Sequence, residues 1–115
     1  MKYKKVKGKI IKGKGKGRIF GFATANIQLD RKIDSGAYYG RVTHGQKDFK
    51  AAIFIPKSQE LLEFHILDFN GDLYGQELEV ELLGKLREPI IFKDEAELIR
   101  QVMADIEAIR KLKLP

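Results

Sequence analysis

The chain has 115 residues and a net charge of +6, a length that suits one domain with a single hydrophobic core. It contains no cysteine, which excludes disulfides and thiolate metal sites and is typical of a reducing compartment. The longest strictly apolar run, residues 51–55, is far shorter than the roughly 20 residues of a membrane span, and the basic N-terminus leads into no apolar secretory segment. We therefore expect a cytoplasmic protein that does not contact membranes.

The excess positive charge is confined to the N-terminus. Residues 1–18 hold eight lysines and Arg18 with no acidic residue, whereas residues 19–115 hold 13 basic and 16 acidic residues. A local basic segment on a mildly acidic body favours a small anionic ligand over a nucleic acid. A basic arm that contacts RNA and a lysine-rich terminus that only aids solubility are the two alternatives.

The first predicted strand covers residues 6–11, and a glycine- and lysine-rich segment follows it. Glycine leaves backbone N–H groups free to approach an anion, so we interpret this segment as a loop that cradles a polyphosphate. Thr24 offers an oxygen to Mg²⁺, and Asn26 completes a hydroxyl and amide cluster. A solvated hairpin tip would have the same composition, and the spacing matches neither a Walker A loop nor a dinucleotide fingerprint. The candidate phosphate-binding residues are Gly13, Lys14, Gly15, Lys16, Gly17 and Arg18.

Most of the remaining chain reads as short strands separated by turn residues. Alternating apolar and polar residues, with turn signals at Ser35-Gly36 and Asn70-Gly71, predict strands over residues 37–43, 49–55, 62–69 and 77–83. No helical period lies between them, which leaves little room for parallel βαβ units. The pattern predicts a mainly β protein with an antiparallel barrel or sandwich.

Glu63 is a candidate general base. It lies two residues from His65 on a predicted strand, so both side chains project from the same face. A carboxylate at the rim of a barrel can accept a proton from a substrate hydroxyl. The alternative is that both residues are ordinary exposed strand residues.

The period changes to that of a helix at Asp94. Asp94 and Glu97 form a capping box, and basic residues near position 111 complement the helix dipole. The apolar residues share one helical face, and we expect the stripe that contains Met103 and Ile106 to be core. The face consists of Leu98, Ile99, Val102, Met103, Ile106 and Ile109.

Taken together, these segments resemble the riboflavin kinase (flavokinase) family over nearly the whole chain. Residues 21–26, Gly-Phe-Ala-Thr-Ala-Asn, resemble the end of the family's glycine-rich loop with its Pro-Thr-Ala-Asn motif. Residues 35–40 resemble the Gly-x-Tyr strand, and residues 62–69 resemble the Glu-x-His-Ile segment. Further similarity continues through residues 72–75, 86–92 and 97–105.

The resemblance implies one domain over residues 1–115, with a six-stranded antiparallel Greek-key barrel over about residues 1–92 and a C-terminal helix over about residues 94–112. It implies transfer of the γ-phosphoryl of ATP to the 5′-hydroxyl of riboflavin, giving FMN and ADP. Thr24 and Asn26 would hold Mg²⁺ and the phosphates, residues 13–18 would cover the nucleotide, and Glu63 would be the base. Tyr74 would lie near the adenine, and the flavin-binding residues would be Arg87, Glu88 and Phe92.

The resemblance also has a bearing on partners. The family includes the C-terminal kinase domain of bacterial bifunctional FAD synthetase, and 115 residues are too few for both activities. We expect a monomer that acts on small molecules, with a separate FMN adenylyltransferase as a downstream partner. Two features depart from the family: Ala23 replaces the proline of the motif, and the loop over residues 56–60 is short.

Two other functions are compatible with parts of the sequence. A small barrel that binds single-stranded nucleic acid would also place aromatic residues among glycines and lysines, as in Arg18, Phe20 and Phe22. A degenerate kinase fold would bind flavin without turnover. Glu63 with Thr24 and Asn26 distinguishes a kinase from a nucleic-acid-binding module, which has no need of them.

Overall fold

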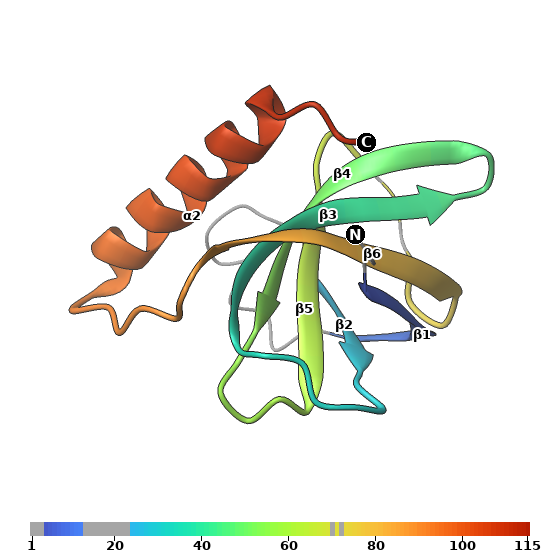
Figure 1. Ribbon diagram of the computed structural model, residues 1–115, viewed down its shortest axis with the longest axis horizontal. Coiled ribbons are helices and arrows are strands. Elements are labelled where there is room, and N and C mark those ends of the chain that lie inside the picture. Colours follow the sequence, from blue (N-terminus) through green and yellow to red (C-terminus); the bar gives the residue numbers. More distant parts are fainter. Residues whose placement is uncertain (1–3, 13–23, 70, 72) are drawn as a thin grey trace.

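The computed structural model describes residues 4–12, 24–69, 71 and 73–115, so the predicted phosphate loop over residues 13–18 lies outside the described residues. The strands close into a barrel in the order β1-β2-β5-β4-β3-β6, with every neighbouring pair antiparallel (Figure 1). The elements are β1 (Lys4–Lys12), β2 (Ala25–Gln28), β3 (Gly36–His44), β4 (Lys47–Ile55), β5 (Leu61–Ile66), β6 (Glu77–Arg87) and α2 (Glu95–Lys111). The predicted six-stranded Greek-key barrel with a C-terminal helix is confirmed.

Alternation of side chains fills the barrel. In β5, Leu62, Phe64 and Ile66 are buried whereas the residues between them are only partly covered. Ile27 of β2 and Ile53 of β4 belong to the same buried cluster. The interior is therefore a packed apolar core, and any polar site must lie on the outer face or at the ends of the strands.

Two strand ends differ from the sequence prediction by more than two residues. The strand predicted over residues 62–69 ends at Ile66, because the backbone turns at Asp68, whose φ is +58°. Leu67 still donates its backbone N–H to the carbonyl of Lys50, at 2.9 Å. In contrast, β6 runs four residues beyond its predicted end to Arg87. Its last residues still pair with β3, with register shifts on β3 between Ala37 and Tyr38 and between Tyr39 and Gly40.

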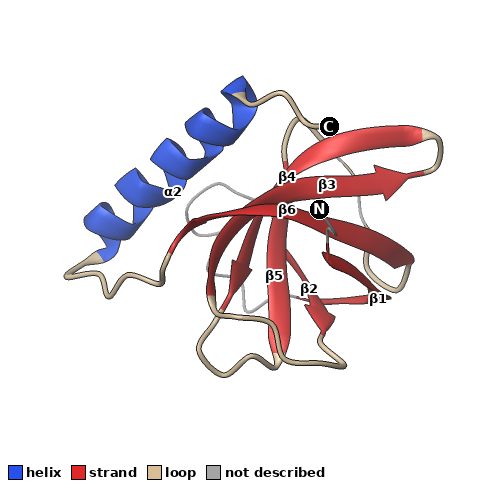
Figure 2. Ribbon diagram, in the orientation of Figure 1, coloured by secondary structure: helices blue, strands red, loops and turns tan. Residues whose placement is uncertain are grey.

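Helix α2 lies against one side of the barrel (Figure 2). Its N-cap is Asp94, whose side chain accepts a hydrogen bond from the Glu97 N–H at 2.9 Å, as the capping box predicted. Ile106 and Ile109 pack with Leu67 in a second buried cluster. Within the described part of the chain, no helix has the length and apolarity of a membrane span.

The expectation that Met103 is core is wrong. Met103 is 56% exposed, whereas Ile106, three positions later, is only 7% exposed. The helix contacts the barrel through Val102, Ile106 and Ile109, and Met103 lies at the edge of that stripe. A six-residue apolar face is broader than the surface that the curved barrel offers.

Candidate functional site

Strand pairing sets Asn26 opposite Glu63. The two residues are Cα partners across β2 and β5, one register step from the partners Ile27 and Leu62. Because Ile27 and Leu62 point into the core, the alternation of side chains turns Asn26 and Glu63 to the outer face. Directly opposed side chains have β-carbons about 5 Å apart, so the amide and the carboxylate are neighbours.

Asn26 is a buried polar side chain with an unused acceptor. The residue is 3% exposed, and its Oδ1 has no hydrogen-bond partner among the described residues. A buried acceptor without a partner lowers the stability of the fold by about 1–3 kcal/mol, so its presence suggests that it binds a ligand. An amide oxygen is a suitable ligand for Mg²⁺, and this orphaned atom fits the metal that the family resemblance implies.

The rest of a metal site would come from few protein groups. No cluster of three acidic, histidine or cysteine side chains occurs in the part of the chain that the structure describes. Mg²⁺ commonly keeps water and substrate phosphates as ligands and takes only one or two from the protein. Thr24 is half-buried and directly precedes β2, so it lies next to Asn26 at the same end of that strand.

The outer row that contains Asn26 and Glu63 continues around the barrel. Glu63 is a Cα partner of Phe54 in β4, Phe54 of Ala37 in β3, and Ala37 of Arg87 at the end of β6. At about 4.8 Å per strand, the row covers about 14 Å from Glu63 to Arg87. It connects the predicted base with the predicted flavin-binding segment, which lie 24 residues apart in the sequence.

Phe54 is a candidate site residue that the sequence analysis did not identify. It is half-buried and lies between Glu63 and Ala37 in the outer row. The neighbouring row of partners, Ala52 and Tyr39, is covered by α2. Phe54 therefore provides an aromatic surface beside the helix. The alternation over residues 49–55 was the signal that it faces away from the core.

The turn that carries Tyr74 is tied to the same end of the barrel. Gly75 donates its N–H to the carbonyl of Ile10 at 3.0 Å, and Ile10 donates to the carbonyl of Gln76 at 2.8 Å. Ile11, the next residue, is the Cα partner of Asn26. Tyr74 itself is 38% exposed, and its turn is bonded to β1 one residue from the partner of Asn26.

Described residues on either side of the glycine-rich segment pair with each other. Lys12 and Ala25, which flank it closely, are Cα partners in β1 and β2. This pair is one register step from the partners Ile11 and Asn26. The segment itself, with the six candidate phosphate-binding residues, lies outside the described residues, so its assignment stays a prediction.

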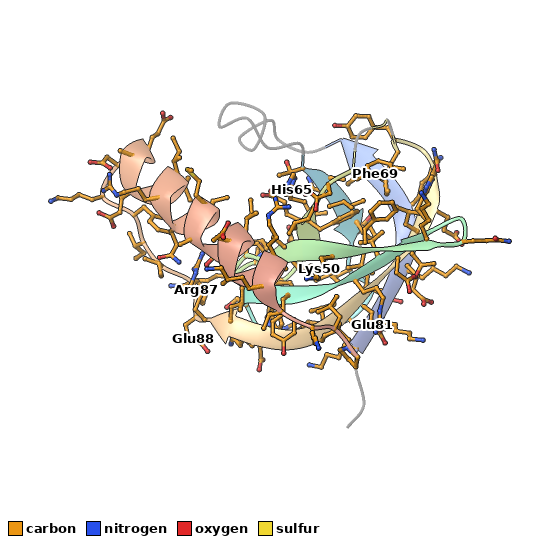
Figure 3. All side chains as sticks on the ribbon, turned by 90° about the horizontal axis from the view of Figure 1, so that it is seen from above. Lys50, His65, Phe69, Glu81, Arg87 and Glu88 are labelled. Atoms are coloured by element: carbon orange, nitrogen blue, oxygen red, sulfur yellow. The ribbon has the colours of Figure 1, made fainter. Side chains whose placement is uncertain are left out.

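The predicted flavin-binding residues have different surroundings. Arg87 forms an ion pair with Asp105 of α2 at 2.8 Å, whereas Glu88 is exposed and pairs with Lys85 at 2.6 Å. Phe92 is half-buried, three residues before the helix begins. Figure 3 shows Arg87 and Glu88 beside the helix, with Phe69 on the far side of the barrel.

An open depression of about 360 Å³ adjoins this segment. Its lining is polar, which does not match the apolar faces of a flavin ring, and its six lining residues include neither Asn26 nor Glu63. We therefore centre the site on the outer row. The depression is lined by Asp34, Ser35, Lys57, Gln59, Lys85 and Glu88.

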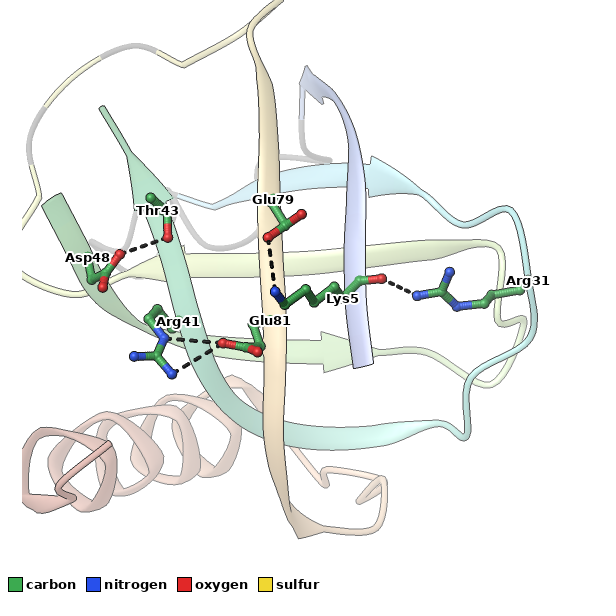
Figure 4. A network of polar contacts seen from close by, with 7 residues as sticks. All are labelled: Lys5, Arg31, Arg41, Thr43, Asp48, Glu79 and Glu81. Atoms are coloured by element: carbon green, nitrogen blue, oxygen red, sulfur yellow. Dashed lines mark hydrogen bonds and ion pairs between the residues drawn. The ribbon is translucent and has the colours of Figure 1, made fainter. Parts of the chain in front are cut away.

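The lysines of β1 are largely matched by acidic residues of β6. Lys5, Lys7 and Lys9 are Cα partners of Glu81, Glu79 and Glu77, in that order. Lys7 pairs with Glu77 at 3.4 Å and Lys5 with Glu79 at 3.9 Å. Figure 4 shows this face, where Arg41 also meets Glu81 and Arg31 contacts the carbonyl of Lys5. Lys5 and Lys7 are therefore paired with acidic residues of β6 within the sheet.

Fold and site together define a closed antiparallel barrel with one covering helix and an amide–carboxylate pair on its outer face. A family model described as riboflavin kinase matches residues 1–113. Riboflavin kinase of Homo sapiens is 30% identical, over 95% of this chain and 81% of that protein. The chain belongs to the riboflavin kinase family.

Two further proteins extend the comparison. The bifunctional riboflavin kinase/FMN adenylyltransferase of Haemophilus influenzae is 34% identical over 90% of this chain and 36% of its own length. The chain thus spans little more than a third of such relatives. The crystal structure of riboflavin kinase from Trypanosoma brucei shares the fold, with a TM-score of 0.64 at 22% identity over 96% of this chain and 80% of that one.

Proposed function

We propose that this protein is an ATP-dependent riboflavin kinase, which transfers the γ-phosphoryl of ATP to the 5′-hydroxyl of riboflavin and releases FMN and ADP. The observation that carries the proposal is the pairing of Asn26 with Glu63 across β2 and β5. It sets a buried amide oxygen without a partner beside a carboxylate. Membership of the family supports the same reaction.

Glu63 acts as the general base in this proposal. The carboxylate accepts the proton of the ribityl 5′-hydroxyl as its oxygen bonds to the γ-phosphorus and the bond to the bridging oxygen of ADP breaks. Phosphoryl transfer depends mainly on in-line positioning and on cations that stabilise spread negative charge. A residue fixed by strand pairing on a closed barrel meets the need for positioning.

Asn26 and Thr24 hold the Mg²⁺ of the nucleotide in this proposal. The metal, when bound, neutralises charge on the phosphates as the phosphoryl group is transferred. The lysines and Arg18 of residues 13–18 supply further positive charge, and their glycines supply backbone N–H groups. Tyr74 stacks near the adenine, since its turn is bonded to the strand next to Asn26.

The flavin lies along the outer row, between Glu63 and the segment over residues 87–92. Phe54 offers its ring to the flavin from the floor of this row, and Phe92 covers it from the segment. The half-buried position of both rings supports this arrangement. FMN made here would then be the substrate of an FMN adenylyltransferase, the activity named in the bifunctional relatives.

The test is to incubate the purified protein with riboflavin, ATP and Mg²⁺ and to separate riboflavin from FMN by chromatography. The matched variants are Glu63→Gln and, as a control, Glu60→Gln, an exposed residue just before β5. Loss of a general base lowers kcat by about 10²–10⁴-fold, so Glu63→Gln should be nearly inactive and Glu60→Gln unchanged.

Three other outcomes of this assay would contradict the proposal or favour one of the alternative functions. A folded wild-type protein that makes no FMN with any nucleoside triphosphate contradicts the proposal. Flavin binding without turnover would then indicate the degenerate kinase fold. Salt-sensitive binding of single-stranded RNA would indicate the nucleic-acid-binding barrel.

A further inference from the structure

A well-shielded ion pair joins the end of β6 to the middle of helix α2. Arg87 Nη2 lies 2.8 Å from Asp105 Oδ2, and Arg87 Nε donates to Asp105 Oδ1 at 3.4 Å. The two side chains are only 19% and 15% exposed. Gln101, one turn earlier in the helix, donates to Asp105 Oδ1 at 2.9 Å. Two parallel bonds between a guanidinium and a carboxylate fix both direction and distance.

Three of the five N–H groups of the Arg87 guanidinium donate to acceptors within the protein. Besides its bonds to Asp105, its Nη1 donates to the carbonyl of Glu88 at 3.3 Å. Each of its three nitrogens therefore has an acceptor. Arg87 is consequently better placed to hold the chain than to contact a ligand directly.

The ion pair also occupies a specific place relative to the proposed site. Arg87 ends the outer row that begins at Asn26 and Glu63, and it directly precedes the segment over residues 88–94 that leads into α2. That segment carries two exposed apolar residues, Ile90 and Ile91. A segment with such residues has little packing of its own to fix its path.

The remaining polar contacts of the helix lie near its other end. Lys50 donates to the carbonyl of Arg110 at 2.7 Å, and Arg110 pairs with Asp68 at 2.7 Å. The Arg110–Asp68 pair is more open, with side chains 47% and 71% exposed. Besides its apolar contacts, the helix thus has polar contacts with the barrel at two places among the described residues, and of these two the Arg87–Asp105 pair adjoins the outer row.

We infer that Asp105 is a positioning residue for flavin binding: with Gln101 it holds Arg87, and thereby fixes residues 88–92 in the arrangement that receives the flavin ring. This inference rests on the proposed function. Fixing a binding segment before the ligand arrives reduces the entropy lost on binding, so the effect falls on riboflavin affinity. Glu63 and Asn26 are set by other strands, so the chemical step is unaffected once both substrates are bound.

The experiment compares Asp105→Asn with the control Asp68→Asn, which breaks the more exposed helix–barrel ion pair and keeps a residue that tolerates the positive φ of that position. Steady-state kinetics with both substrates are combined with hydrogen exchange of the amides over residues 88–94. Asp105→Asn should raise the KM for riboflavin about tenfold or more, leave kcat and the KM for ATP within about twofold, and accelerate exchange in the segment. Asp68→Asn should change neither riboflavin KM nor exchange there.

A second pair of variants keeps the test decisive if Asp105→Asn folds poorly. Gln101→Leu removes only the supporting hydrogen bond and should raise the riboflavin KM by about two- to fivefold. The exchanged pair Arg87→Asp with Asp105→Arg should recover part of the affinity that each single change loses. A wild-type riboflavin KM and unchanged exchange in Asp105→Asn, or an equal effect of Asp68→Asn, would overturn the inference.

The two proposals fail in distinguishable ways. If the wild-type protein makes no FMN, the proposed function fails. Exchange over residues 88–94, and flavin binding followed by fluorescence, still show whether Asp105 fixes the segment. If the wild-type protein makes FMN and Asp105→Asn alters only global stability, the positioning role of Asp105 is wrong and the proposed function is supported.

Discussion

Asn26 and Glu63 face each other across strands β2 and β5, and the backbone ladder rather than a loop sets their relative position. The amide is buried, its oxygen has no hydrogen-bond partner among the described residues, and the carboxylate is half-buried beside it. Natural proteins seldom bury an unsatisfied acceptor unless a ligand uses it. The same buried oxygen should therefore lower stability in the free protein and serve the nucleotide in the bound one.

Replacing Asn26 with leucine should separate stability from activity. The change removes an orphaned acceptor whose burial costs about 1–3 kcal/mol, so the free energy of unfolding without ligands should stay equal or rise by about 1 kcal/mol. The rate of FMN formation should fall by about 10²–10³-fold, because an oxygen at the phosphate site is lost. Urea denaturation with and without Mg-ATP, together with the kinase assay, measures both effects.

The matched control is Gln28→Leu, an exposed position in the same strand. It should leave the rate unchanged, and the nucleotide should still raise its resistance to urea. Stabilisation of Asn26→Leu by Mg-ATP equal to that of the wild type would show that the amide does not serve the nucleotide site.

Phe54 should contribute to riboflavin binding through its ring. Phe54→Leu keeps an apolar side chain but loses aromatic contacts, which are worth about 0.5–1.5 kcal/mol, so the KM for riboflavin should rise by about two- to tenfold with kcat nearly constant. Phe49→Leu is a suitable comparison, since Phe49 packs edge-on to Phe69 at 5.2 Å on another part of the barrel. An equal rise in KM in both variants would assign the effect to general loosening.

Tyr38 should make the protein more sensitive to alkaline pH. Burial raises the pKa of its hydroxyl, with Lys85 nearby opposing the shift, and the hydroxyl donates to the carbonyl of Asp34 at 2.6 Å. Below about pH 9, Tyr38→Phe should cost about 1 kcal/mol through the lost hydrogen bond. Above pH 10 the unfolded tyrosine releases its proton before the folded one does, so the wild type loses this stability and the difference should shrink.

Urea denaturation of the wild type and Tyr38→Phe between pH 8 and pH 10.5 measures this difference. Tyr74→Phe is the matched control for removal of a tyrosine hydroxyl, because Tyr74 lies in a turn and is more exposed than Tyr38. A difference between wild type and Tyr38→Phe that is constant over this pH range would contradict the raised pKa.

The sequence predicted those features that follow from local periodicity. Alternation identified most of the strands and the shared face of Glu63 and His65, and the Asp94 capping box located the start of α2. The functional assignment depended on order along the chain, since Thr24, Asn26 and Glu63 are recognisable only as members of successive family segments. Their roles remain proposals.

The features that the sequence could not predict depend on contacts between distant segments. The opposition of Asn26 and Glu63 requires β2 to pair with β5 across an intervening hairpin, and no local pattern specifies that register. The role of Phe54 follows from the same pairing. The family resemblance predicted that Arg87 binds the flavin. Its ion pair with Asp105 depends on how α2 packs on the barrel, which no local pattern specifies. Met103 is exposed because the barrel surface curves away from it.

The charge pattern of β1 and β6 leads to a last prediction. Lys7 lies opposite Glu79 and pairs with Glu77, so Lys7→Glu gathers three carboxylates and should lower the free energy of unfolding by about 0.5–1 kcal/mol at low salt. Exchanging the charges, with Lys7→Glu and Glu77→Lys together, should restore most of this loss, and high salt should reduce the effect of the single change. Urea denaturation of both variants and the wild type at low and high NaCl measures these changes in the free energy of unfolding. If Lys7→Glu is neutral in low salt, the acidic residues of β6 do not stabilise Lys7 and this prediction is wrong.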